Sequence, residues 1–155
     1  MSVEERLSEL GIDLPPSPKP IAIYRPAVQS GNMVYVSGQV AVGADGIIHP
    51  GTLGDSVSVE QGREAARGAT INALAAANGL LGGLEGVKVV RLVGYVASTP
   101  DFHDQPAVID GASELLRDVL GEEAGVGARL ALGVTSLPVR SPVEIELILE
   151  IGEAS

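Results

Sequence analysis

The stretch that decides the fold is a long apolar run, Val87-Lys88-Val89-Val90-Arg91-Leu92-Val93-Gly94-Tyr95-Val96-Ala97-Ser98. Its length and its β-branched residues predict a β-strand. Apolar side chains occupy both alternating sets of positions, so both faces of this strand are expected to be covered. One layer of helices covers only one face of a sheet. The other face therefore needs a second layer or another subunit.

The last strand, predicted over residues 142–151, alternates more strictly. One set of positions is apolar without a break, whereas the other holds Glu144, Glu146 and Glu150 with Ile148 among them. A period of two residues is typical of a strand whose two faces have different environments. This strand therefore directs one face to the core and presents the glutamates on the other.

A hairpin is predicted near the N-terminal side, with strands over 27–29 and 33–37 joined by the triplet Ser30-Gly31-Asn32. β-Branched and aromatic residues flank this turn on both sides. Gly38 then interrupts the second strand. A glycine in a strand often marks a bulge or the close approach of another group.

Two helices are predicted between the strands. Ser58 and Gln61 form a capping box that starts a helix running to about Asn78, with Gly79 as its terminator. Pro106 suits the first turn of the second helix. A further strand over 129–135 completes the order hairpin, helix, strand, helix, strand, strand. That order predicts an α+β fold with two helices packed on one face of a mixed sheet.

The first sixteen residues are expected to form an appendage to the domain, which then spans residues 17–155. Ser2 and Glu5 are spaced as a capping box for a short helix. Four prolines between residues 15 and 20 end any helix there and favour an extended connector.

Composition excludes several classes of function. The 155 residues carry a net charge of −10 and include only one Phe, three Tyr and no Trp, which argues against nucleic-acid binding. Cys is absent, so no thiolate nucleophile, disulfide or zinc–cysteine site is available. The two histidines stand alone in polar loops, and no phosphate-binding glycine motif occurs. We expect neither a metal nor a cofactor.

Nothing in the sequence indicates a membrane protein. The segment Ser2-Val3-Glu4-Glu5-Arg6 is acidic and no secretory apolar run follows it, nor is any apolar stretch long enough to span a bilayer. We expect a cytoplasmic protein without a membrane partner.

Arg129 stands out because only ten residues are Lys or Arg, and it lies between Ala128 and Leu130. Two explanations remain open. A guanidinium binds a small carboxylate through two parallel charge-assisted hydrogen bonds. Alternatively, Arg129 pairs at the surface with one of the twenty acidic residues.

Two groups of motifs resemble one known family. The segment Ser30-Gly31-Asn32-Met33-Val34-Tyr35-Val36-Ser37-Gly38-Gln39 resembles a hairpin of the RidA family, also called YjgF/YER057c/UK114. Ala128-Arg129, Leu137-Pro138 and Val143-Glu144-Ile145-Glu146 resemble its closing motif, and the resemblance covers roughly residues 18–151. It implies a single domain of the bacillus-type, chorismate-mutase-like fold, assembled as a homotrimer with a ligand cleft at each subunit interface.

The resemblance also implies roles for individual residues. Arg129 matches the arginine that anchors the substrate carboxylate, and Glu144 matches the glutamate that positions or activates the attacking water. Gly38 matches the glycine whose backbone lines the cleft. Ala131 stands where the family often has Cys, and its backbone N–H would assist binding. Tyr24 has the family's usual tyrosine spacing from the hairpin.

Asp110 is the candidate for the family's helix asparagine, and an acid at this position could change the ligand. The best-known members hydrolyse enamines and imines such as 2-aminoacrylate to 2-keto acids and ammonia. Others are assigned as binding or stress proteins. The alternative for this chain is therefore a non-catalytic, small-carboxylate-binding or regulatory trimer that uses the same cleft. Both hypotheses require Arg129, so the sequence leaves the choice and the physiological substrate open. The old family label "endoribonuclease" is disfavoured by the charge and aromatic content given above.

Overall fold

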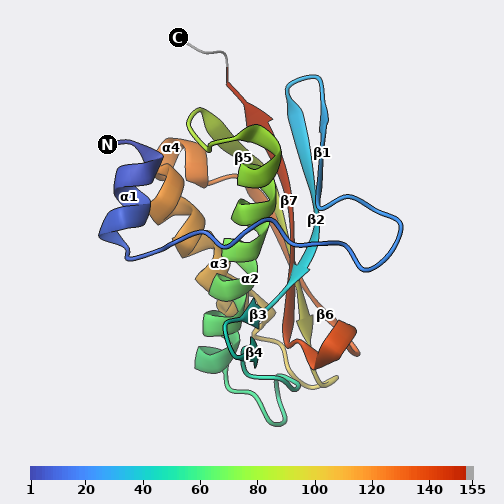
Figure 1. The fold of residues 1–155 in the computed structure, drawn as a ribbon. Helices are drawn as coiled ribbons and strands as arrows, with labels where there is room; N and C mark the ends of the chain where they lie inside the picture. The colour runs from blue at the N-terminus through green and yellow to red at the C-terminus, as the bar shows by residue number, and fades with distance from the viewer. Residues whose placement is uncertain (153–155) are drawn as a thin grey trace.

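A five-stranded mixed sheet with two long helices on one face forms the body of the molecule in the computed structural model, which describes residues 1–152 (Figure 1). In the sheet the strands follow the order β1-β2-β7-β5-β6. Only β5 and β6 are parallel neighbours; the other pairs are antiparallel. The predicted α+β class is confirmed. The strands are β1 (Ala27–Ser30), β2 (Met33–Val40), β5 (Val87–Ala97), β6 (Ala128–Val134) and β7 (Val143–Ile151).

Strand β7 lies at the centre of the sheet, between β2 and β5. Its alternation is the one predicted, because one set of side chains is fully buried beneath the helices and Glu144, Glu146 and Glu150 are half-buried on the other face. The pairing fixes the register of both neighbours, with Val34 and Val89 each opposite Leu149. The fully buried set is Val143, Ile145, Leu147 and Leu149.

The β1–β2 hairpin closes through a two-residue turn, Gly31-Asn32, since Ser30 already pairs with Met33. Gly31 has φ +61°, which glycine adopts without steric cost. Further along β2 the pairing with β7 shifts between Val36 and Gln39. The bulge predicted at Gly38 is therefore confirmed.

Helix α2 (Val59–Leu81) begins with the predicted capping box between Ser58 and Gln61 but ends three residues later than expected. Its C-cap is Gly82, whose left-handed backbone (φ +73°) ends the helix. Gly79 was therefore the wrong terminator. A Cβ at Gly79 would lie 2.6 Å from the side chain of Ser17, so this glycine lets the N-terminal connector pass close to the helix.

Helix α3 (Gln105–Leu120) carries Pro106 in its first turn, as predicted, and ends before Gly121. It packs closely on α2 at Gly111, which has no side chain. A Cβ at Gly111 would overlap the backbone carbonyl of Arg63 on α2, so only glycine allows the two helices to lie this close. This contact fixes the position of α3 over β5 and β6.

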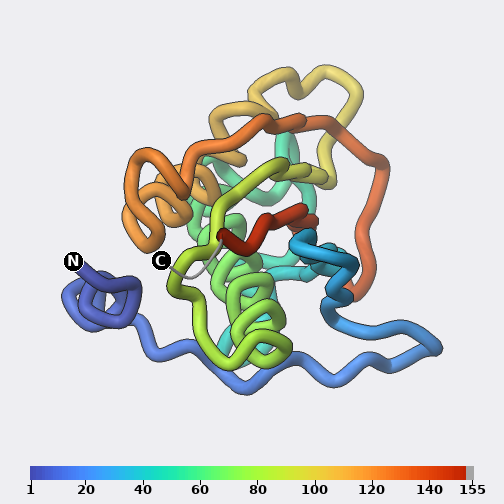
Figure 2. The backbone as a smooth tube through the Cα atoms, turned by 90° about the horizontal axis from the view of Figure 1, so that it is seen from above, coloured from blue at the N-terminus to red at the C-terminus, as the bar shows by residue number. Residues whose placement is uncertain are grey.

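The N-terminal residues pack against this body, with Leu7, Ile12 and Leu14 in contact with the hydrophobic core. Helix α1 (Val3–Glu9) starts with the Ser2–Glu5 capping box and packs against α3, with Val3 buried. The following connector runs along the outside of α2 (Figure 2). Four short elements of the structure were not predicted from the sequence: β3 (Val42–Gly43), β4 (Gly46–Ile47), α4 (Glu122–Gly125) and the 3₁₀ helix η1 (Pro138–Arg140). Within residues 1–152 no helix combines the length and the apolar character needed to cross a membrane.

Gly111→Ala should destabilise the fold by roughly 2 kcal/mol and lower Tm by about 5 °C, because the added methyl group overlaps α2. Alanine has the higher helix propensity, so a net loss of stability would show that packing decides. Thermal and urea unfolding measure the effect. Asp118→Ala, at an exposed position of α3, is the control and should change Tm little. An unchanged Tm for Gly111→Ala would contradict the close contact.

Candidate functional site

Arg129 lies on β6, the edge strand of the sheet, and its side chain projects toward α3. In the β5–β6 ladder Arg129 is opposite Leu92, which is buried beneath the helices. Residues opposite each other in a sheet project to the same face. The guanidinium therefore lies on the helix-covered face, at the rim where the sheet ends.

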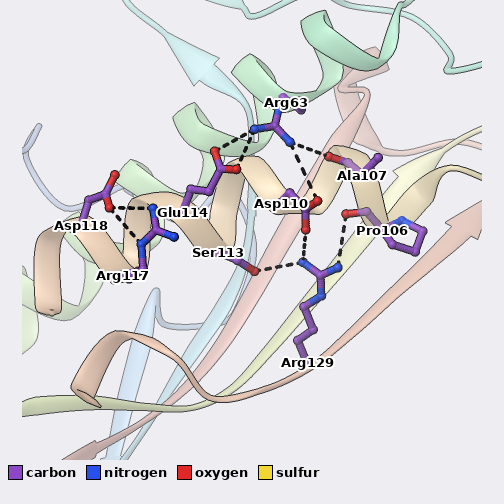
Figure 3. Close-up of polar contacts among 9 residues, drawn as sticks. All are labelled: Arg63, Pro106, Ala107, Asp110, Ser113, Glu114, Arg117, Asp118 and Arg129. Carbon is purple, nitrogen blue, oxygen red and sulfur yellow. Dashed lines mark hydrogen bonds and ion pairs between the residues drawn. The ribbon is translucent and has the colours of Figure 1, made fainter. Parts of the chain in front are cut away.

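Three groups of α3 hold the guanidinium (Figure 3). Its Nη1 donates to Asp110 Oδ1 at 2.8 Å and to Ser113 Oγ at 3.0 Å. Its Nη2 donates to the carbonyl of Pro106 at 3.3 Å. The pairing with an acid that the sequence left open is therefore present. The side chain remains 30% exposed, so part of it is still accessible.

A second arginine adjoins this cluster. Arg63 on α2 donates twice to Glu114, at 2.8 and 2.7 Å, and once to the carbonyl of Ala107. Its Nη1 lies 4.0 Å from Asp110 Oδ2. Asp110 therefore stands between two arginines, the nearer of which is Arg129 (Figure 3).

Beside Arg129 the surface is apolar. A hollow of about 200 Å³ adjoins the arginine and is lined mainly by Val89, Leu92, Leu116 and Val126. Ala131 follows two residues along β6, opposite Gly94, and so projects to the same face as Arg129. A compact ligand held by Arg129 would therefore meet small and aliphatic side chains.

Glu144 lies on the opposite face of the sheet. It pairs with Tyr95, which is three residues from Leu92 along β5 and therefore projects away from the helices. A hollow of about 490 Å³ opens there. It is lined by Tyr24, Ser37, Gly38, Tyr95, Glu144 and Glu146.

The bulge in β2 brings Gly38 against Glu144. A Cβ at position 38 would lie 3.1 Å from Glu144 Cδ and 3.3 Å from its Oε1, closer than side chains usually pack. The absence of a side chain at Gly38 thus leaves room for the carboxylate. The sequence predicts a bulge or the close approach of another group at Gly38, and the group that approaches is the carboxylate of Glu144.

The environment of Glu144 favours its protonated form. Burial raises the pKa of this carboxyl above its usual range, and the negative charge of Glu146 raises it further. Glu146 is held in place, since Tyr95 Oη donates to its Oε1 at 3.2 Å. Burial, followed by Glu146, also raises the pKa of Tyr95. A carboxyl with a raised pKa in a hollow is a candidate acid–base group.

The six residues predicted from the sequence therefore form two clusters. Arg129, Ala131 and Asp110 are near one another at the helix-covered rim. Tyr24, Gly38 and Glu144 line the hollow on the uncovered face. Within one chain the sheet separates the two clusters.

Sequence reasoning missed Ser113, Tyr95 and Glu146 as members of these clusters. Ser113 follows Asp110 by three residues in a helix, so the spacing placed both on one face. The sequence placed Tyr95 within the apolar run of a strand and Glu146 among the glutamates on the face opposite the core. Only the strand register shows that these two contact each other.

No three His, Cys, Asp or Glu residues within 1–152 are grouped as a metal site would require. His49 instead lies 2.6 Å from the carboxylate of Glu64. Asn72 has a structural contact as well, since its amide donates to the carbonyls of Val40 and Val42 at 3.1 and 2.9 Å.

Residues 15–151 match the sequence profile described as Endoribonuclease L-PSP, which comprises the YjgF and RidA proteins. The chain belongs to this family. Solved YjgF and RidA structures have the same chorismate-mutase-like fold, as the resemblance implied.

Three proteins similar to this chain carry different descriptions. Protein TCP17 of Trypanosoma cruzi is 39% identical over 151 residues, which cover 97% of this chain and 94% of TCP17. A 2-iminobutanoate/2-iminopropanoate deaminase of Dermatophagoides farinae is 30% identical over 140 residues, or 90% of this chain and 94% of the deaminase. A crystal structure of a protein of unknown function from Agrobacterium tumefaciens has 43% identity and a TM-score of 0.89, covering 96% of this chain and 92% of that one.

Glu146→Gln should lower the pKa of Glu144, because it removes the neighbouring negative charge while the burial remains. The pKa should stay above the usual range for a glutamate, since burial is the larger cause. Carbon-detected NMR titration of the side-chain carboxyl groups measures it. Glu150→Gln, on the same face of β7, should leave the pKa of Glu144 unchanged. Equal titration of Glu144 in wild type and Glu146→Gln would refute the coupling.

Proposed function

We propose that this protein hydrolyses 2-imino acids and their enamine tautomers, of the 2-aminoacrylate type, to 2-oxo acids and ammonia. The observation that carries this proposal is the guanidinium of Arg129, oriented by α3 and open along one edge beside an apolar hollow. This arrangement suits a small carboxylate with a short aliphatic remainder. The deaminase of Dermatophagoides farinae, with 30% identity, supports the same reaction.

We further propose that the working site lies between neighbouring copies of a homotrimer. The sheet separates Arg129 from Glu144 within one chain, so one ligand meets both only where the rim of one copy adjoins the hollow of another. The uncovered face supports this arrangement. Three large apolar side chains are exposed on it: Val28 at 43%, Tyr35 at 47% and Leu130 at 45%. A second copy of the chain would bury this apolar surface.

In this proposal Arg129 binds the substrate carboxylate and fixes the position of the neighbouring C2 atom. The backbone N–H of Ala131 assists at the same rim, while Tyr24 and the backbone of Gly38 line the opposite side of the cleft. Orientation of this kind lowers the entropic part of the barrier, because the carbon and the water are held within reach of each other.

The chemistry needs few groups because an imine carbon is already electrophilic. The reacting form is the protonated imine: Glu144 accepts a proton from water as the oxygen bonds to C2, and the C=N π pair becomes the lone pair of the amino group. The product is a carbinolamine. Glu144 then donates that proton to the amino group, the C–N bond breaks and ammonia leaves, while the hydroxyl gives its own proton to Glu144 as the C=O bond forms. The raised pKa makes the Glu144 carboxylate a stronger proton acceptor than an ordinary glutamate, as the first of these transfers requires.

RNA cleavage is not proposed, although the family description contains the word endoribonuclease. The net charge of −10 offers no basic face for phosphates. Both hollows described above contain too few aromatic and basic residues to bind a strand of RNA.

Light scattering should give about three times the mass of the 15.8 kDa chain. Leu130→Glu should dissociate the assembly, because a charge on the uncovered face would be buried without a partner. Leu80→Glu is the control: this leucine is similarly exposed, at 43%, but lies on α2. A stable wild-type monomer would contradict both the trimer and the shared site.

Glu144→Gln should slow imine hydrolysis by about 10²- to 10⁴-fold, because glutamine keeps the shape of the side chain but accepts no proton. Binding of 2-oxobutanoate, a product-like carboxylate, should remain. The assay follows 2-oxo acid formed from freshly generated 2-aminoacrylate, with spontaneous hydrolysis subtracted. Equal turnover in a folded, trimeric Glu144→Gln protein would show that Glu144 is not the base. Binding without turnover in wild type would establish the alternative, a non-catalytic carboxylate-binding trimer.

A further inference from the structure

The contacts of Arg129 leave a defined part of its guanidinium for a ligand. A guanidinium has five N–H groups. Asp110 and Ser113 take the two on Nη1, and the carbonyl of Pro106 takes one on Nη2. The N–H of Nε and the second N–H of Nη2 remain. These belong to the two nitrogens of one edge, so the arginine has space for a single carboxylate, bound side-on.

The charges around Arg129 are already balanced. Asp110, at 2.8 Å, offsets the charge of Arg129, and Glu114 offsets that of Arg63 through two hydrogen bonds. One turn further along α3, Arg117 pairs with Asp118 at 3.1 Å. Each of the three arginines drawn in Figure 3, Arg63, Arg117 and Arg129, thus has its own carboxylate.

A second negative charge on the ligand would therefore find no unpaired cation among these three arginines. It would lose its hydration and face Asp110 and Glu114, which are about half exposed at 47% and 48%. Apart from Arg129, the adjoining hollow is lined by aliphatic residues, glycines and the uncharged Ser113, so it offers no second cation. A substrate with one carboxylate avoids this cost.

We infer that Asp110 is a specificity-determining residue that restricts the Arg129 site to monocarboxylates whose remainder carries no negative charge. This inference rests on the proposed function and names its substrate class: 2-imino acids with neutral or basic side chains, and not those with acidic side chains. Asp110 acts through Arg129 and through its own charge, since the same contact that orients the guanidinium also neutralises it.

The test compares the binding of 2-oxobutanoate and 2-oxoglutarate by calorimetry at fixed ionic strength. These probes differ in the second carboxylate. Wild type should bind 2-oxobutanoate at least about fivefold more tightly. Asp110→Asn keeps the size and an oxygen acceptor for Arg129 but removes the charge, so it should reduce this preference by about fivefold or more. Asp118→Asn removes the same charge from the same helix away from Arg129 and should leave the preference unchanged.

Equal affinity of wild type for the two probes would overturn the inference. So would an unchanged preference in a folded Asp110→Asn protein, or the same reduction in Asp118→Asn, which would indicate a general charge effect. Arg129→Lys separates this inference from the proposed site. If Arg129→Lys loses both ligands while Asp110→Asn keeps the wild-type preference, Arg129 is the anchor and only the role of Asp110 fails. If Arg129→Lys binds both ligands as wild type does, the anchor fails, and the role of Asp110 fails with it.

Discussion

The pleat of the central strand β7 is the constraint on which the rest of the structure depends. Successive side chains of a strand point to opposite faces. In β7 this directs four fully buried aliphatic residues toward α2 and α3, and three glutamates toward the uncovered face. A shift of register by one residue would place glutamates beneath the helices. The hydrophobic core and the position of Glu144 are therefore set by the same alternation.

The fold was predictable because its signals are local or strictly periodic. The capping boxes at Ser2 and Ser58, the bulge at Gly38 and the alternation of β7 all act over a few residues. The end of α2 was not predictable from the chain alone. Gly79 has the residue type of a terminator, but it serves a tertiary contact with Ser17, fifty residues or more away in sequence. Only the structure shows which glycine takes the left-handed conformation.

The residues of the candidate site could be predicted from the sequence, but their placement relative to one another could not. The resemblance selected Arg129 and Glu144. The pairing register between β5, β6 and β7 does not follow from the residue pattern, so only the structure shows that the two residues lie on opposite faces of the sheet. It also presented anchoring and surface pairing as alternatives for Arg129. The structure combines them, since Asp110 pairs with one part of the guanidinium and leaves the other open. Whether one guanidinium can pair with an acid and also bind a ligand depends on the positions of its neighbours, which the residue types alone do not specify.

The place of β7 has a consequence for the order in which the chain is assembled. It is the last of the five strands in sequence, yet it forms the middle of the sheet, with Met33 paired to Glu150 across most of the chain. Until β7 is synthesised, β2 and β5 each present a bare edge where their central partner belongs. Pairing over such sequence separations slows folding, and open edges favour association with other chains. During synthesis, the nascent chain is therefore most exposed to aggregation just before its final strand emerges.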